Sequence, residues 1–368
     1  MRGVAALLVV FGHARLHAFG QSEPRDHGAL GVVLDVISLW GHSAVIVFFA
    51  LSGFLVGGKL INASTVDDRF MADYAIDRAA RIYTVSIPAM AIAVVLGVAF
   101  TAIYGQYFSL TNSHCVVTVG DFPPTLLFVI QSLGGGTCAN GAFWSLICEV
   151  LYYVAFALAL AGARWRGRRM ISLGLLVLLL GYIALDSLWG EGEVLGYAPI
   201  WMMGALFAVP ASDRLKWLWG GAIVAMSIAL SPLLTESLEA FRDVILGLMV
   251  CISILDIRRV TWAPPVWSAR AAGALAAVSY SLYLMHAPIM NATRTVLERS
   301  FSVRLGRDGV DVVTVAGFFA FVALGVMAGL ICYLAFERHT MTVRRWLKSR
   351  IVPKPSGGPE SVGSERPS

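Results

Sequence analysis

The segment His42–Gly58, which reads HSAVIVFFALSGFLVGG, decides the class of this fold. It contains no Lys, Arg, Asp or Glu, and its length lies within the roughly 17–25 residues that a helix needs to cross a bilayer. An apolar segment of this kind is typical of a transmembrane helix. The rest of the chain is therefore considered first as that of a membrane protein.

The overall composition supports this interpretation. Of the 368 residues, 58% are apolar or aromatic and 14% are charged, against about 45–50% and about 25% in soluble domains. The mean hydropathy of +0.74 excludes a soluble protein, and the composition also excludes disordered, collagen-like and disulfide-stapled secreted chains. The net charge of +5 does not require a nucleic-acid partner, and we expect none. Membrane proteins concentrate Lys and Arg in their cytoplasmic loops, which accounts for the excess.

Further apolar stretches predict an all-α, polytopic integral membrane protein with about ten transmembrane helices. The run Thr125–Leu133 is too short to span the bilayer and is predicted to be interfacial or re-entrant. The predicted spans are Arg2–Phe19, His42–Gly58, Arg81–Tyr104, Ala142–Gly162, Met170–Leu185, Val194–Pro210, Trp217–Leu230, Phe241–Ile254, Ala271–Met290 and Asp311–Phe336.

The distribution of positive charge predicts the orientation. With the N-terminus inside, most of the 28 Lys and Arg residues fall in cytoplasmic segments, as the positive-inside rule requires. Both termini are therefore predicted to be cytoplasmic, in a multi-pass protein of the cell (inner) membrane. The loop after the ninth span departs from the rule. The residues that this map places outside are Arg15, Arg25, Arg242, Arg294, Arg299, Arg304 and Arg307.

The chain is predicted to comprise a membrane domain over residues 1–340 and a disordered cytoplasmic tail over residues 341–368. After Pro353 the tail consists of Pro, Gly, Ser and Glu with almost no apolar residue, so it cannot bury a core. The first apolar stretch lacks a basic leader and a small-residue cleavage site, so we expect no cleavable signal peptide.

One loop, Gly105–Gly141, lies on the outer side of this map and contains no Lys or Arg. It carries Cys115 and Cys138, which can form a disulfide on the oxidising side of a membrane. The alternative is a pair of free thiols.

Polar residues inside the spans carry the candidate chemistry, because they are costly in hydrocarbon and are usually functional. Arg2 and His13 lie on one helix face, about 16 Å apart along the axis. Ser52 lies about 15 Å deep in the second span, and Glu149 lies one turn past Ser145 on the same face of the fourth. We expect these groups to converge near the middle of the membrane.

The ninth span brings Ser279–Ser281 and His286 to middle and outer depths of the same region. Each polar residue could instead form an ordinary interhelical hydrogen bond. His13 and His17 have the i, i+4 spacing that suits a metal, but no third ligand follows at a recognisable spacing, so we expect no metal site.

Six segments resemble, in order, the motifs of the acyltransferase-3 family of polytopic membrane acyltransferases. Thr84 and His339 stand where members of that family usually have Pro, a difference that concerns loop geometry. The matching segments are Arg2–His13, Phe48–Leu55 with its Leu-Ser-Gly-Phe, Arg78–Tyr83 with its Arg-x-x-Arg-Ile, Phe143–Glu149 with its Trp-Ser-Leu-x-x-Glu, Ser279–His286 and Phe336–Arg338.

The resemblance implies an O-acyltransferase that moves an acyl group, commonly acetyl, from cytoplasmic acyl-CoA to a hydroxyl of a carbohydrate or other cell-envelope acceptor. Acyl-CoA would be a donor substrate, and no permanently bound cofactor is implied. His13 would act as general base or transient acyl carrier, with Glu149 orienting it. The residues implied in substrate binding are Arg2, Arg78 and Arg81 at the CoA phosphates, together with Ser52, Trp144, Ser145, Tyr280, Ser281 and His286.

Two other classes of protein share these features. A transporter or flippase would use His13, Glu149 and the Arg residues as a proton or substrate relay. A membrane scaffold without catalytic activity is the third candidate. The release of free thiol from acyl-CoA would separate the enzyme from both.

Overall fold

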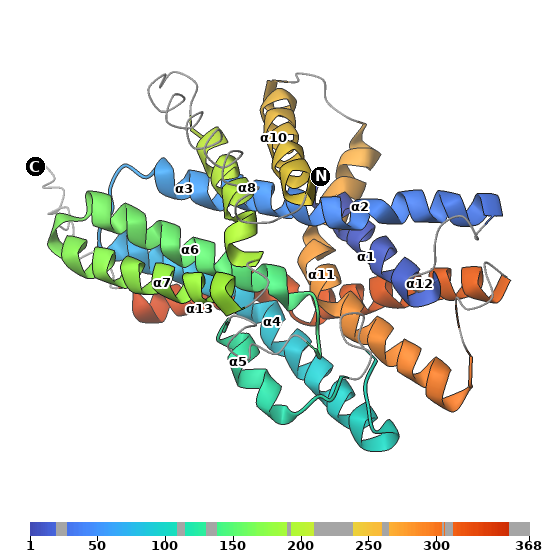
Figure 1. Ribbon diagram of the computed structural model, residues 1–368. Helices are drawn as coiled ribbons and strands as arrows, with labels where there is room; N and C mark the ends of the chain where they lie inside the picture. Colours follow the sequence, from blue (N-terminus) through green and yellow to red (C-terminus); the bar gives the residue numbers. More distant parts are fainter. Residues whose placement is uncertain are drawn as a thin grey trace, which may run out of the picture.

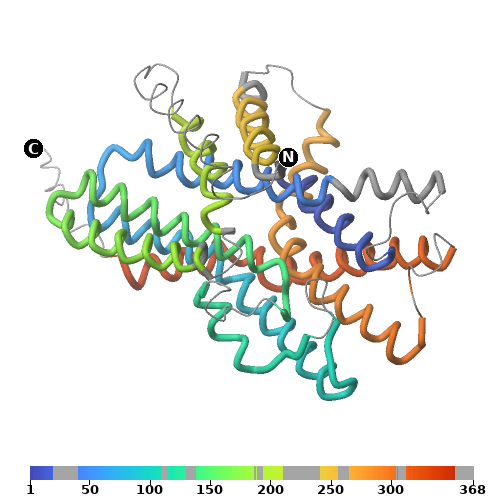
Figure 2. The backbone as a smooth tube through the Cα atoms, viewed as in Figure 1, coloured from blue at the N-terminus to red at the C-terminus, as the bar shows by residue number. Residues whose placement is uncertain are grey.

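The computed structural model describes residues 1–19, 28–108, 115–129, 138–189, 193–209, 238–259, 265–303, 305 and 312–352 (Figures 1 and 2). Every regular element among these residues is helical, which confirms the all-α prediction. The one extended pairing they contain is an isolated antiparallel bridge between Tyr107 and Cys115.

The helices follow the predicted order of apolar stretches, with short 3₁₀ turns at Val119–Asp121, Arg166–Arg168 and Glu337–His339. A π-helical turn, Gly53–Gly57, joins α2 to α3 without a break in the helix. The α-helices are α1 (Arg2–Phe19), α2 (Gly28–Ser52), α3 (Gly58–Ile61), α4 (Asp68–Tyr104), α5 (Phe122–Leu126), α6 (Phe143–Arg164), α7 (Arg169–Trp189), α8 (Glu193–Phe207), α10 (Leu238–Arg259), α11 (Val266–Ser300), α12 (Val312–Ala335) and α13 (Thr340–Ile351).

Six helical stretches in the described part of the chain are long and apolar enough to cross a membrane, so the protein is a multi-pass membrane protein. The predicted span Trp217–Leu230 lies outside the described residues. The number ten and the orientation of the termini stay predictions. The six stretches are Trp40–Ile61, Asp68–Tyr104, Phe143–Arg164, Arg166–Leu185, Val266–Ser300 and Val312–Ile351.

Helix α11 is the hub of the bundle and packs against α1, α4 and α12. Pro288 lies inside this helix and has no N–H to donate to the carbonyl of Leu284, one turn earlier. The Asn140 side chain donates to that carbonyl instead, with Nδ2 and the oxygen 2.8 Å apart. Asn140 is completely buried. A residue of the loop before α6 therefore supplies the hydrogen bond that the proline removes.

Glycines allow α8 to lie directly against the end of α2. A Cβ on Gly53 would lie 1.8 Å from the carbonyl oxygen of Trp201, and one on Gly57 would lie 2.4 Å from Cβ of Ala205. On the other side of the contact, a Cβ on Gly204 would lie 2.1 Å from the carbonyl oxygen of Ala50. Gly53 and Gly57 thus form the small-xxx-small pattern by which membrane helices approach closely.

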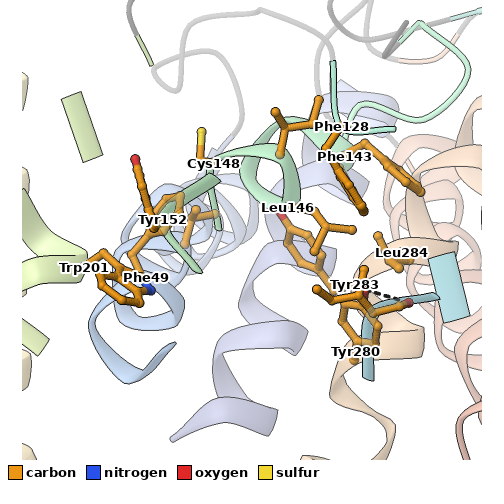
Figure 3. Close-up of a cluster of buried hydrophobic side chains, with 14 of the residues drawn as sticks. Phe49, Phe128, Phe143, Leu146, Cys148, Tyr152, Trp201, Tyr280, Tyr283 and Leu284 are labelled. Atoms are coloured by element: carbon orange, nitrogen blue, oxygen red, sulfur yellow. Dashed lines mark hydrogen bonds between the residues drawn. The ribbon is translucent and has the colours of Figure 1, made fainter. Parts of the chain in front are cut away.

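An aromatic cluster fills the space beside this contact (Figure 3). The ring centroids of Phe49 and Tyr152 are 6.1 Å apart, and those of Tyr152 and Trp201 are 5.9 Å apart. Figure 3 shows these three rings together on one side of Leu146. Tyr280, Tyr283 and Leu284 lie on the opposite side. The aromatic side chains therefore connect α2, α6 and α8.

Helix α13 corrects the first part of the predicted disordered tail, residues 341–368, because residues 340–351 are helical. Residues 353–368 of that tail lie outside the described residues. It packs on α4, where Arg344 and Lys348 reach the buried carboxylate of Asp77. Arg344 Nη2 donates to Asp77 Oδ2 at 2.8 Å, and Lys59 Nζ donates to the same oxygen at 2.9 Å. Lys348 also pairs with Asp73 at 2.9 Å. These ion pairs fix a helix that composition alone did not reveal.

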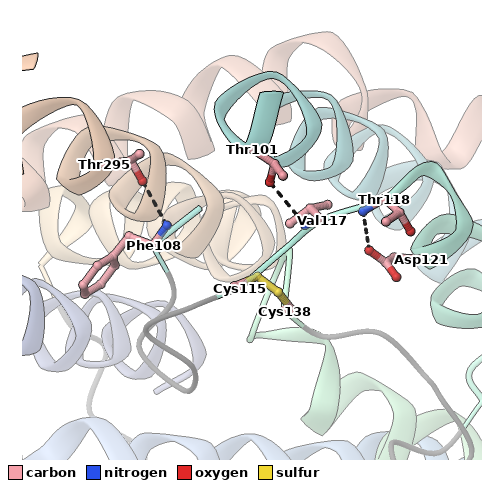
Figure 4. Close-up of a disulfide and its surroundings, with 8 residues drawn as sticks. All are labelled: Thr101, Phe108, Cys115, Val117, Thr118, Asp121, Cys138 and Thr295. Atoms are coloured by element: carbon pink, nitrogen blue, oxygen red, sulfur yellow. Dashed lines mark hydrogen bonds between the residues drawn. A yellow bond between two sulfur atoms is a disulfide. The ribbon is translucent and has the colours of Figure 1, made fainter. Parts of the chain in front are cut away.

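The loop between α4 and α6 contains a disulfide between Cys115 and Cys138 (Figure 4). Their Cα atoms are 6.0 Å apart, a usual separation for such a bond. The Tyr107 N–H donates to the Cys115 carbonyl at 2.8 Å, and the Thr295 hydroxyl accepts from the Phe108 N–H at 3.0 Å. The loop is thus tied to α11. Its outward orientation and its oxidation in cells stay predictions.

Candidate active site

A cavity of about 340 Å³ lies where α1, α2, α4, α6 and α11 meet. Three guanidinium groups, one carboxylate and several hydroxyls face it, together with apolar side chains. Such a concentration of polar groups among apolar helices is typical of a functional site. The polar and aromatic-hydroxyl residues that line it are Arg2, Ser52, Arg78, Arg81, Ser145, Glu149, Tyr153, Ser279, Tyr280 and Tyr283.

Glu149 is the carboxylate of this cavity. It interacts with the hydroxyls of Ser52 and Tyr153 and with the positive charges of Arg2 and Arg78. Because Tyr153 follows Glu149 by four residues, both side chains lie on the same face of α6. The carboxylate is therefore hydrogen-bonded to two hydroxyls and lies in the electrostatic field of two guanidinium groups, which four helices contribute.

Ser52 is fixed at the end of α2, where the π-helical turn begins. Its Oγ lies 2.8 Å from the hydroxyl of Tyr153 and accepts from Trp201 Nε1 at 3.2 Å. Single π-turns are frequent at functional sites because they change the direction of the side chains that follow. Here the turn coincides with the close contact between α2 and α8, so packing and site geometry are coupled.

Arg81 lines the cavity and forms an ion pair with Glu337, which does not line it. Its Nη2 lies 3.5 Å from Glu337 Oε1, and its guanidinium lies 5.6 Å from the centre of the Tyr280 ring. The second oxygen of the buried Glu337 accepts from the Ser281 hydroxyl at 2.7 Å and from the Ser281 N–H at 3.0 Å. The structure thus places Ser281 behind Arg81, away from the cavity lining where we expected it.

Arg78, three residues earlier on α4, lies between two aromatic rings. Its guanidinium carbon is 6.0 Å from the ring centres of both Tyr74 and Tyr153. Its Nε is buried and has no hydrogen-bond partner among the described residues. An Arg that is stacked and retains a free donor is ready to bind an anion.

His13 and His286 form a second group outside the cavity lining. His13 Nδ1 lies 2.6 Å from His286 Nε2, and the two ring planes are 19° apart with centroids 4.8 Å apart. Glu149 instead faces Arg2, which lies about 16 Å from His13 along α1. In the structure the ring of His286, and not the carboxylate of Glu149, is therefore the side chain that contacts His13.

Tyr283 connects the two groups. It lines the cavity, and its hydroxyl lies 2.6 Å from Ser145 Oγ. Its ring centroid is 5.9 Å from that of His286 and 5.5 Å from that of Phe48. Cavity and histidine pair are therefore neighbours along α11, with one tyrosine between them.

Two further predicted positions lie beside these groups. Trp144 belongs to the aromatic cluster, with its ring 5.3 Å from Tyr197 and 6.2 Å from Phe49, and it is not among the residues that line the cavity. His17 is fully buried, and neither ring nitrogen has a hydrogen-bond partner among the described residues. Among those residues no cluster of three His, Cys, Asp or Glu could hold a metal.

Tyr153, Tyr283 and Glu337 complete the site, and we did not single them out from the sequence. The signal for the first was its spacing of four from Glu149, and for the second its spacing of three from Tyr280. Glu337 lies in a segment that we noted only for its resemblance. Its contact with Arg81 joins residues that are far apart in the sequence and has no local signal.

The comparisons with known proteins identify the family of the chain. A family model for the acyltransferase-3 family, described as an acyltransferase domain, matches residues 1–337. No curated protein and no solved structure matches the chain. The family match includes every helix that lines the cavity and both histidines of the pair. The chain belongs to the acyltransferase-3 family and is a membrane acyltransferase.

Proposed function

We propose that this membrane acyltransferase is an O-acyltransferase that uses cytoplasmic acyl-CoA as donor and a hydroxyl of a carbohydrate or cell-envelope acceptor. Acetyl is the first acyl group to test, and the cell (inner) membrane is the proposed location. The observation that carries the proposal is the cavity lined by three Arg residues beside the His13–His286 pair. No permanently bound cofactor is proposed.

The three guanidinium groups suit the phosphates of CoA. Arg2, Arg78 and Arg81 line one cavity in which Glu149 is the sole carboxylate among the described lining residues. Arg forks bind phosphate oxygens in pairs, and Arg78 has a buried donor that no described residue uses. The cavity is therefore complementary to a polyanion.

The histidine pair suits the transfer step. We propose that His13 takes the proton from the acceptor hydroxyl as its oxygen attacks the thioester carbonyl. The C–S bond then breaks, and the proton passes to the departing CoA thiolate, so the base is regenerated. The thin pantetheine arm would bring the thioester from the Arg residues toward His13, over about 16 Å along α1. Transient acylation of His13 is the alternative route.

Purified protein should release free thiol from acetyl-CoA when an acceptor is present. His13→Ala should lower the rate by about 10²–10⁴-fold, the usual contribution of a general base. His17→Ala, one turn later on α1, is the matched control and should retain most of the activity. Wild-type turnover by His13→Ala, or greater damage from His17→Ala, would contradict the assignment.

A transporter or flippase is the alternative function, because the same intramembrane charges could form a relay. Reconstituted vesicles would separate the two. A transporter would move its substrate without releasing thiol, whereas the enzyme would consume acyl-CoA supplied on the cytoplasmic face and none supplied on the other.

A further inference from the structure

The hydrogen bonds around His286 determine which nitrogen of His13 is free to act as a base. His286 Nδ1 lies 3.1 Å from the carbonyl oxygen of Leu282, and His286 Nε2 lies 2.6 Å from His13 Nδ1. We infer that His286 is a positioning residue that keeps the proton of neutral His13 on Nδ1 and leaves Nε2 as the base. This inference rests on the proposed function of His13.

The position of each proton follows from the chain of contacts. A carbonyl oxygen only accepts, so His286 Nδ1 must carry the hydrogen that is donated to Leu282. In a neutral imidazole the other nitrogen is then an acceptor, so His286 Nε2 accepts from His13 Nδ1–H. His13 Nε2 consequently holds a lone pair. No described residue contributes a hydrogen bond to it.

The packing around His286 leaves it little freedom to change partners. Its side chain is completely buried, and a Cβ on Gly325 of α12 would lie 3.4 Å from its Cβ. Pro288 lies two residues later, where Asn140 binds the Leu284 carbonyl and the Tyr107 hydroxyl donates to the Pro288 carbonyl at 2.8 Å. The hydrogen bonds from Asn140 and Tyr107 thus fix the segment of α11 that carries His286.

This arrangement performs without a carboxylate one of the tasks that an Asp performs in a serine-protease triad, which is to fix the tautomer of the base. When Nε2 takes the acceptor proton, His13 becomes an imidazolium whose Nδ1–H still donates to His286. When Nε2 returns the proton to the CoA thiolate, the starting tautomer is restored. An incorrect tautomer is expensive in this chemistry, because Nε2 would carry a hydrogen and could not accept another.

The tautomer of His13 can be measured directly in the full-length protein. The protein carries ring-¹⁵N-labelled His, and a His13→Gln variant identifies the His13 signals among the 7 His residues. We expect wild-type His13 to be protonated at Nδ1. His286→Leu should shift it to the Nε2–H form that a free side chain prefers. Protonation of wild-type His13 at Nε2 would overturn the inference.

Kinetics with acetyl-CoA test the consequence. His286→Leu should lower kcat by about 10²-fold and leave the KM for acetyl-CoA within about twofold, because the Arg cavity is separate. His286→Gln places an amide oxygen near the former Nε2 and should restore kcat to within about tenfold of wild type. A purely structural role would predict no such rescue, so equal losses in the two variants would overturn the inference.

The tautomer measurement and the kinetics together also separate this inference from the proposed function. The tautomer is observed without turnover. An Nδ1–H tautomer in a protein that transfers no acyl group would refute the proposed function and leave the positioning intact. Full activity in His286→Leu, with His13→Ala inactive, would refute the positioning role alone.

Discussion

Asn140 compensates for the hydrogen bond that Pro288 removes from α11, so replacing it with Leu should destabilise the protein. In Asn140→Leu the Leu284 carbonyl loses the donor that lies 2.8 Å away. Pro288, at the position that would normally donate, has no N–H to replace it. The perturbation therefore leaves that carbonyl without a donor in the interior of the bundle. It also removes the Asn140 Oδ1 that accepts from the Ala142 N–H at 3.2 Å.

The expected loss follows from burial. Asn140 and Leu284 are both completely buried, so water cannot take the place of the missing donor. Leaving a buried acceptor without a partner costs about 1–3 kcal/mol, and we expect Asn140→Leu to lower the free energy of unfolding by about 2 kcal/mol. Pro288→Ala restores an N–H one turn from the Leu284 carbonyl. In that background the same substitution should cost about 1 kcal/mol less, because the loss at the Leu284 carbonyl is relieved and only the Ala142 N–H loses its partner.

Unfolding in mixed micelles of a mild detergent and SDS measures the four free energies of this cycle. Asn62→Leu is a matched control, because Asn62 also donates to a backbone carbonyl, that of Gly58, but its side chain is exposed. It should cost at most about 0.5 kcal/mol. An equal cost of Asn140→Leu with and without Pro288 would refute the reasoning.

Arg78→Ala and Arg81→Ala should each raise the KM for acyl-CoA by roughly 10- to 100-fold, the value of one charge-assisted contact, with little change in the acceptor KM. Arg81→Lys should recover part of the loss, because a point charge lacks the bidentate fork. In intact cells, Cys115 and Cys138 should resist alkylation until a reductant is added. Gly53→Ala should lower the free energy of unfolding by about 1–3 kcal/mol, since its Cβ would lie 1.8 Å from a backbone oxygen of α8.

Each of these predictions has a result that would contradict it. An unchanged acyl-CoA KM in a variant that carries both Arg78→Ala and Arg81→Ala would show that this cavity does not bind the donor. Alkylation of both cysteines in unreduced cells would show free thiols, and labelling by an impermeant reagent only after lysis would overturn the topology. Gly174→Ala on α7, where a Cβ would meet open space, is the control for Gly53→Ala and should be nearly neutral.

Hydropathy was sufficient to predict most of the helices, because each of them needs only a local run of apolar residues. It did not reveal α13, whose position depends on ion pairs with Asp77 in α4. It also did not reveal the π-helical turn Gly53–Gly57, which accompanies the contact with Trp201. Both features depend on a partner far away in the sequence, and a single sequence does not show which segments meet.

Helical periodicity explains which of the predicted site residues line the cavity. Ser145 and Glu149 are four apart and both line the cavity, whereas Trp144, rotated by about 100° from Ser145, lies in the aromatic cluster. Tyr280 and Ser281 are separated in the same way. Consecutive residues in a motif therefore lie in different environments. Only residues three or four apart are expected to share an environment, because they lie on the same face of the helix.

The ion pairs of α13 bear on how this enzyme can be shortened or tagged. The family match ends at residue 337, before α13 begins. A gene trimmed at that boundary would remove Arg344 and Lys348, leaving Lys59 as the basic partner of the buried Asp77, which directly precedes the cavity residue Arg78. The segment that keeps this end of α4 in place thus lies beyond the edge of the recognisable family domain. A purification tag is best attached after Val352.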